Sequence, residues 1–152
     1  MQLSQNFSLL DLIKSPTATR KGIDNTPDNE QIANLSALCK NILEPLRLLL
    51  NSEIIITSGF RSPKLNVAIG GSKTSSHCKA EAADFEVQKM SNKEAFEIIR
   101  KSGLIFDQLI AEGYDEQTDD FDWIHISYRI GNNRKQVLKA TFVNGKPIYT
   151  PF

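Results

Sequence analysis

The chain has 152 residues, the size of one ordinary domain, and 40% of them are hydrophobic, which is enough for one core. Its 18 Lys and Arg residues balance 18 Asp and Glu residues, so the formal net charge is zero. A nucleic-acid partner needs clustered positive charge, and this balance gives no reason to expect one. No segment approaches the roughly 18 apolar residues of a spanning helix, so we expect no membrane insertion.

The N-terminal residues lack the pattern of a secretory signal, which starts with positive charge and continues into an unbroken apolar run. The first basic residue is Lys14, and Asp11 interrupts the short apolar stretch before it. We therefore expect a protein that is synthesised in the cytoplasm without a signal peptide. To act outside the cell, it would need another protein to release it.

The first third of the chain predicts two helices. A short helix at about residues 8–14 is followed by a loop over residues 15–29, which is rich in Pro, Thr, Asn and Asp. A long helix then begins with Thr26 as its N-cap and Pro27 in its first turn. Pro45 is expected to kink this helix or to end its regular part. The apolar residues recur at helical spacing: Ile32, Leu35, Leu38, Cys39, Ile42, Leu43, Leu46 and Leu49.

Strands dominate the rest of the chain. Residues 53–57 include three consecutive isoleucines and predict a strand buried on both faces. Ser91 and Glu94 form a capping box for a helix that stops at Gly103. The other predicted elements are a loop over 61–76, strands over 82–87, 106–111 and 123–130, and a hairpin of 141–143 and 146–149 with Asn144-Gly145 as its turn and Pro147 on an edge. Because no βαβ rhythm appears, we predict one α+β domain over residues 1–152, with helices packed on a small, mainly antiparallel sheet.

Two histidines, one aspartate and the predicted strands suggest a metal site. His77 lies in a loop, Asp84 begins a strand on its polar face, and His125 projects from another strand on the face opposite Ile124 and Ile126. Catalytic zinc sites take three such ligands and leave a position open for water. The three side chains can converge on one ion, although a lone histidine is more often structural than a ligand.

Two charged residues are candidates for roles beside such an ion. Asp122 lies three residues before His125, where an acidic loop bends into the strand, and its carboxylate could take a proton from a zinc-activated water. Arg61 directly follows the strand of isoleucines. It could hold a substrate carboxylate or the charge that builds on an attacked carbonyl.

The segment over residues 58–85 combines several short motifs in a fixed order. An SG-aromatic-RSP turn ending at Pro63 is followed by Asn66, a Gly-Gly pair and a pattern that reads S-x-H-x-x-A-x-A-x-D. Further along the chain, Asp122 lies three residues before the final histidine, His125, and Trp123 lies between them. This set closely resembles the M15 family of zinc D,D-carboxypeptidases and their phage endolysin relatives. The resemblance runs from about Phe7 to Tyr128, and the opening of the chain looks like the phage-type branch.

The resemblance implies a function and a role for each site residue. His77, Asp84 and His125 would hold one Zn²⁺ ion, Asp122 would be the general base, and Arg61 would stabilise the substrate or transition state. The implied fold is the hedgehog/D,D-peptidase zinc-binding fold. The implied substrates are peptidoglycan stem peptides, cut at D-Ala-D-Ala or at L-Ala-D-Glu. We expect a monomeric enzyme that acts on the cell wall, in phage or prophage lysis.

Some features leave alternatives open. Where the family has Gly in H-x-x-G, this chain has Ala80, which would be strained by about 1 kcal/mol if the position needs a positive φ. The same scaffold could hold zinc as a non-catalytic binding domain for the cell wall or a partner. A cysteine hydrolase that pairs Cys78 with His125 is a third reading, although two cysteines are more simply a core residue, Cys39, and a bystander.

Overall fold

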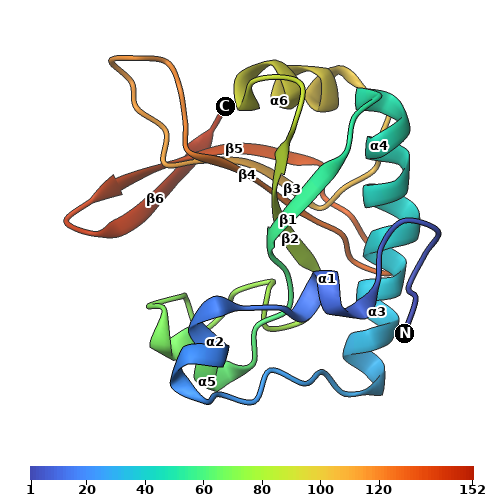
Figure 1. Ribbon diagram of the computed structural model, residues 1–152. Coiled ribbons are helices and arrows are strands. Elements are labelled where there is room, and N and C mark those ends of the chain that lie inside the picture. The colour runs from blue at the N-terminus through green and yellow to red at the C-terminus, as the bar shows by residue number, and fades with distance from the viewer.

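The computed structural model describes residues 1–152 as an α+β fold in which helices pack around a six-stranded sheet (Figure 1). The strands lie in the order β1-β2-β4-β3-β5-β6. Their bounds are β1 Ile54–Ser58, β2 Ala82–Val87, β3 Gln108–Glu112, β4 Trp123–Ser127, β5 Gln136–Val143 and β6 Lys146–Pro151.

The sheet is mixed, which corrects the expectation of a mainly antiparallel sheet. β3 pairs with its neighbour β4 in antiparallel fashion but with β5 in parallel. The path of the chain after β4 explains this arrangement. The end of β4 lies beside the start of β3, where Asp107 N donates a hydrogen bond to Ser127 O at 2.8 Å. The chain then passes around that end, with Lys135 N donating to Phe106 O. Since β5 starts at the same end as β3, the two strands run parallel.

The helices are mostly short. Their bounds are α1 Leu9–Ile13, α2 Pro16–Lys21, α3 Asn29–Leu38, α4 Glu44–Leu50, α5 Pro63–Ala68 and α6 Asn92–Lys101. Two of them, α2 and α5, lie inside segments that we predicted as loops. Each begins with a Pro after a Ser N-cap, which favours a helix, but each is too short to show an apolar period in the sequence. None of the helices combines the length and the apolar character that crossing a membrane would require.

The long helix starts later than predicted. Asp28, not Thr26, is the N-cap, and its side chain accepts from Gln31 N while the Gln31 side chain returns to the Asp28 backbone. The irregularity expected at Pro45 is present as a π-helical turn, η1, over Cys39–Leu43 between α3 and α4. The wider turn lets the helix continue past a proline that has no N–H to donate.

One face of the sheet packs against the helices and forms the core. Alternate residues of the central strands face this core, including Phe85 of β2, Leu109 of β3 and Ile124 of β4, which are fully buried. Leu38, Ile42 and Leu46 of the long helix, and Phe96 of α6, pack in the same cluster. This alternation, predicted from the sequence, sends the even-numbered residues of β2 and the odd-numbered residues of β4 to the opposite face.

The two edges of the sheet differ from each other. β1 is an edge strand, and Ile55 is 40% exposed, so the prediction that this strand is buried on both faces is wrong. A run of isoleucines does not reveal whether a second layer covers it. The β5–β6 hairpin extends away from the body of the molecule (Figure 1), with the predicted Asn144-Gly145 turn at positive φ and Pro147 on the outer strand.

Candidate metal centre

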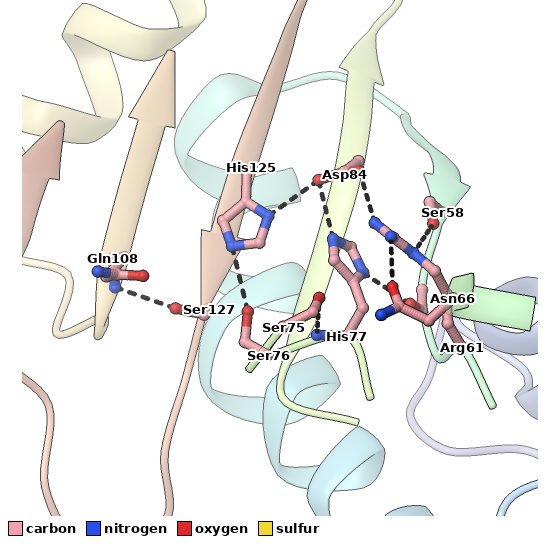
Figure 2. A network of polar contacts seen from close by, with 11 residues as sticks. Ser58, Arg61, Asn66, Ser75, Ser76, His77, Asp84, Gln108, His125 and Ser127 are labelled. Atoms are coloured by element: carbon pink, nitrogen blue, oxygen red, sulfur yellow. Dashed lines mark hydrogen bonds and ion pairs between the residues drawn. The ribbon is translucent and has the colours of Figure 1, made fainter. Parts of the chain in front are cut away.

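Three ligand-type side chains meet on the face of the sheet that is away from the long helix (Figure 2). Asp84 of β2 lies directly opposite His125 of β4 in the antiparallel register, and His77 comes from the loop before β2. Asp84 Oδ1 is 3.0 Å from His125 Nδ1 and 3.2 Å from His77 Nε2. All three residues are buried, and their ligand atoms lie within 4.8 Å of one another.

The loop before β2 holds His77 in one orientation. The backbone N–H of His77 donates to the Ser75 hydroxyl at 3.2 Å. Its ring Nδ1 donates to the Gly59 carbonyl at 2.7 Å, and because a carbonyl only accepts, Nδ1 carries the proton. The other ring nitrogen, Nε2, is the atom directed at Asp84. A backbone carbonyl that orients an imidazole in this way is typical of metal-ligating histidines.

The electrostatics of the cluster favour an ionised Asp84. Burial by itself would raise the pKa of this carboxyl, but the charge on His77 and the hydrogen bonds from both imidazoles outweigh it and hold the pKa below its usual range. Two imidazole nitrogens and one carboxylate oxygen form the donor set of a catalytic zinc site, with a coordination position left open. The residues present therefore fit a zinc ion.

Arg61 is fixed at the border of this cluster by two side chains. Its Nε donates to the Ser58 hydroxyl at 3.2 Å and its Nη1 to the Asn66 amide oxygen at 3.1 Å, while Nη2 lies 3.8 Å from Asp84 Oδ2. Asn66 is itself buried, and a Cβ on Gly71 would lie 2.0 Å from its amide oxygen. Gly71 thus leaves room for the asparagine that positions the guanidinium.

Ala80 occupies the position where the resemblance led us to expect glycine. Its φ is +59°, so the loop does require the left-handed conformation there. The Ala80 methyl group is fully buried in the core cluster. Burial of the methyl group offsets part of the cost of the strained backbone, which explains how the loop keeps its shape.

Asp122 does not join the cluster. Its side chain is exposed and makes no hydrogen bond or ion pair with any of the three ligand residues. Its Oδ2 lies where a Cβ on Gly113 would be, only 2.3 Å away, and Gly113 has a φ of +71°. Asp122 precedes β4, which begins at Trp123, so strand alternation does not fix the direction of its side chain. The role of general base for Asp122 stays a prediction.

A buried carboxylate that the sequence analysis missed lies on the ligand face. Glu112 ends β3 and pairs with Trp123, two residues along β4 from His125. Burial raises the pKa of Glu112 to about 7; His125 and Arg61 oppose this rise, and the charge of Asp84 adds to it. The predicted strand over 106–111 stopped one residue short. Extending it by alternation from Ile110 would have placed Glu112 beside the site.

Cys78 lies outside the ligand set, although it follows His77 in the chain. Burial raises the pKa of its thiol, which disfavours the thiolate that a nucleophile or a metal ligand must be. His125 has Asp84 and Ser76 as its polar neighbours, and no hydrogen bond joins it to Cys78. This geometry gives no support to the cysteine hydrolase.

Comparisons with known proteins agree with this donor set. The family model described as Peptidase M15 matches residues 5–127, which include His77, Asp84, His125 and Arg61. The match ends with β4 and leaves out the β5–β6 hairpin. A search of curated proteins finds no match. Since the family model covers most of the chain, the protein belongs to the peptidase M15 family, whose members are zinc-dependent peptidases.

Proposed function

We propose that this protein is a zinc metallopeptidase that hydrolyses a peptide bond in peptidoglycan stem peptides, at D-Ala-D-Ala or at L-Ala-D-Glu, during phage or prophage lysis. The observation that carries the peptidase activity is the convergence of His77, Asp84 and His125 with a fixed arginine beside them. The wall substrate rests on the resemblance of the motifs to cell-wall peptidases. The hedgehog/D,D-peptidase fold, the single domain over residues 1–152 and a monomeric state belong to the same proposal.

His77, Asp84 and His125 would hold the zinc ion. When bound, zinc supplies a Lewis acid that polarises a carbonyl and lowers the pKa of water toward about 7. The protein contributes a rigid mounting, because two ligands come from hydrogen-bonded strands and the third is fixed by the Gly59 carbonyl. A preorganised site of this kind spends little free energy on rearrangement during the reaction.

Arg61 would bind negative charge at the border of the cluster. Its guanidinium already lies 3.8 Å from Asp84 and is oriented by Ser58 and Asn66, so it does not need to be ordered by the substrate. Negative charge appears on the carbonyl oxygen as water attacks, and a stem peptide also ends in a carboxylate. A planar guanidinium suits either group.

A carboxylate must take a proton from the attacking water and deliver it to the departing amine. The resemblance assigns this step to Asp122. Asp122→Asn should therefore retain zinc and lose at least about 100-fold in kcat. Undiminished cleavage by this variant would remove Asp122 from the reaction.

The test of the function is mass spectrometry of purified peptidoglycan digested with the zinc-loaded protein. We expect release of D-Ala or of fragments cut after L-Ala, loss of both with a chelator, and recovery when zinc is returned. The matched control is His125→Ala, which removes one ligand. Binding to the wall without any released product would support the non-catalytic binding domain instead.

A further inference from the structure

The β5–β6 hairpin carries side chains on the same face of the sheet as the metal centre. In the register, Trp123 of β4 pairs with Glu112 of β3. Glu112 pairs in turn with Ala140 of β5, and Ala140 with Tyr149 of β6. Paired residues of neighbouring strands project from one face. Since Trp123 and His125 alternate onto the same face of β4, Tyr149 shares that face with the ligand cluster.

Three aromatic residues form a strip along this row, which we call the aromatic strip: Trp123, Phe142 and Tyr149. The rings of Trp123 and Phe142 have their centroids 6.4 Å apart. Phe142 and Tyr149 are diagonal neighbours in the hairpin, a spacing that aromatic side chains can bridge. Phe142 is 48% exposed and Tyr149 is 50% exposed, so folding leaves much of the strip free to contact a ligand. The family match ends before the hairpin and does not account for either residue.

The Tyr149 hydroxyl lies in the electrostatic field of the metal centre. Burial raises the pKa of Tyr149 to about 12, the charges of Glu112 and Asp84 add to this rise, and Arg61 opposes it. Two strands, β3 and β5, separate β6 from β4 in the sheet. Because the charges of Asp84 and Arg61 nevertheless reach the hydroxyl, the tyrosine side chain is directed across the sheet toward the ligand cluster.

This hydroxyl is available as a hydrogen-bond donor. Tyr114, on β3's side of the hairpin, donates its hydroxyl proton to Asp119, whereas the Tyr149 hydroxyl has no partner within the chain. A phenol whose pKa is about 12 keeps its proton at neutral pH and can donate it to an acceptor oxygen. A peptide offers such oxygens in its carbonyl and carboxylate groups.

Tyr149 and Arg61 approach the metal centre from opposite edges of the sheet. Arg61 follows β1, the strand at one edge, and Tyr149 belongs to β6, the strand at the other edge. The ligands Asp84 and His125 lie on β2 and β4, between these two residues. A peptide that contacts both Arg61 and Tyr149 therefore passes over the ligand cluster.

We propose that Tyr149 is a substrate-binding residue whose hydroxyl donates a hydrogen bond to an oxygen of the stem peptide, on the side of the metal centre away from Arg61. This inference rests on the proposed function. The rest of the aromatic strip lies against the same part of the peptide, whose methyl groups and peptide planes pack on the exposed rings. Arg61 and Tyr149 thus hold two parts of one peptide, and the bond to be cut lies between them.

The activity test compares Tyr149→Phe, which removes only the hydroxyl, with Ile148→Ala in the zinc-loaded protein. Ile148 is the matched control, because it is 48% exposed on the same strand but points to the opposite face. We expect Tyr149→Phe to keep one zinc per chain, to raise KM by about 3–10-fold and to leave kcat within about threefold, which is the effect of losing one hydrogen bond to the substrate. Ile148→Ala should leave KM within about twofold.

Two results of this comparison overturn the proposal. One is an unchanged KM in Tyr149→Phe, and the other is an equal rise of KM in Ile148→Ala, which would assign the effect to the hairpin as a whole. A wild-type protein that cleaves no peptide defeats the proposed function instead, so the two failures are distinguishable.

A second measurement does not depend on turnover. The chain has three tyrosines, and carbon-13 labelling of their phenol carbons gives three NMR signals, of which Tyr149→Phe identifies one. In the chelator-treated protein, a synthetic stem peptide that contains both candidate bonds should move the Tyr149 signal until it saturates, while the Tyr114 signal stays in place. A peptide that binds, as calorimetry would show, without moving the Tyr149 signal overturns the proposal.

Discussion

The two faces of the sheet carry different kinds of buried residue. On the helix-covered face, the buried side chains of the central strands are apolar and belong to one core cluster, among them Ala83, Phe85, Leu109, Ala111, Ile124 and Ile126. On the opposite face, the same strands bury four polar or charged residues beside the apolar Ala82 and Ile110; these are Asp84, Glu112, His125 and Ser127. Residues that are adjacent in the chain thus serve opposite purposes.

Within each central strand, neighbouring residues therefore contribute to different properties: one to the stability of the fold and the next to the chemistry of the site. Apolar burial contributes to folding in proportion to area, and it needs no specific partner. Buried polar groups contribute only when they are paired, and an unpaired one opposes folding. The helix-covered face should therefore govern the free energy of unfolding, and the ligand face should govern zinc binding and turnover.

The largest expected effect comes from removing a ligand. His125→Ala leaves His77 and Asp84 to hold the ion, and we expect activity to fall more than about 1000-fold, beyond the 10–100-fold typical of an outer-shell partner. Zinc content after dialysis and the rate of peptide release measure the effect. Full zinc occupancy in this variant would contradict the ligand assignment.

A substitution on the helix-covered face should do the reverse. Phe85 is fully buried beside Asp84, and Phe85→Ala should lower the free energy of unfolding by about 3–5 kcal/mol. Urea denaturation measures this loss. We expect the folded fraction to bind zinc with unchanged stoichiometry, and loss of zinc from well-folded protein would show that the two faces are not independent.

Glu112 should make the stability of the zinc-free protein depend on pH. The pKa of its carboxyl rises from 4.5 to about 7 on folding, so the folded protein binds the proton more tightly and stability falls as pH rises between these values. The full difference corresponds to at most about 3 kcal/mol.

Glu112→Gln should remove this slope and stabilise the zinc-free protein above pH 7, as thermal melts across pH 4–8 would show. The matched control is Glu86→Gln, an exposed glutamate on the same face, which should leave the slope in place. A wild-type protein whose stability does not fall over this pH interval would contradict the burial of an ionisable, unpaired Glu112.

The smallest expected effect is at Ala80, where two terms oppose each other. Glycine would relieve the positive φ of +59° by about 1 kcal/mol, but it would remove a buried methyl group worth a similar amount. Ala80→Gly should therefore change the free energy of unfolding by less than about 1 kcal/mol. A larger change in urea denaturation would show that one of the two terms dominates.

The sequence by itself determined the features that depend on local pattern. The alternation in β2 and β4 correctly separated Phe85 and Ile124 from Asp84 and His125, and Asn144-Gly145 marked the hairpin turn. The motif set identified the residues that meet at the candidate metal centre. Each of these depends on spacing within a few residues, which the backbone geometry of a strand or turn translates directly into direction.

Only the tertiary structure decided how the strands are placed beside one another. It made β3 and β5 parallel, left Ile55 of β1 exposed at an edge, and placed Glu112 on the same face as His125. Pairing between strands joins residues that are distant in the chain, and no local period records which strand lies next to which. The burial of Glu112 on the same face as His125 was therefore visible only after the register was known.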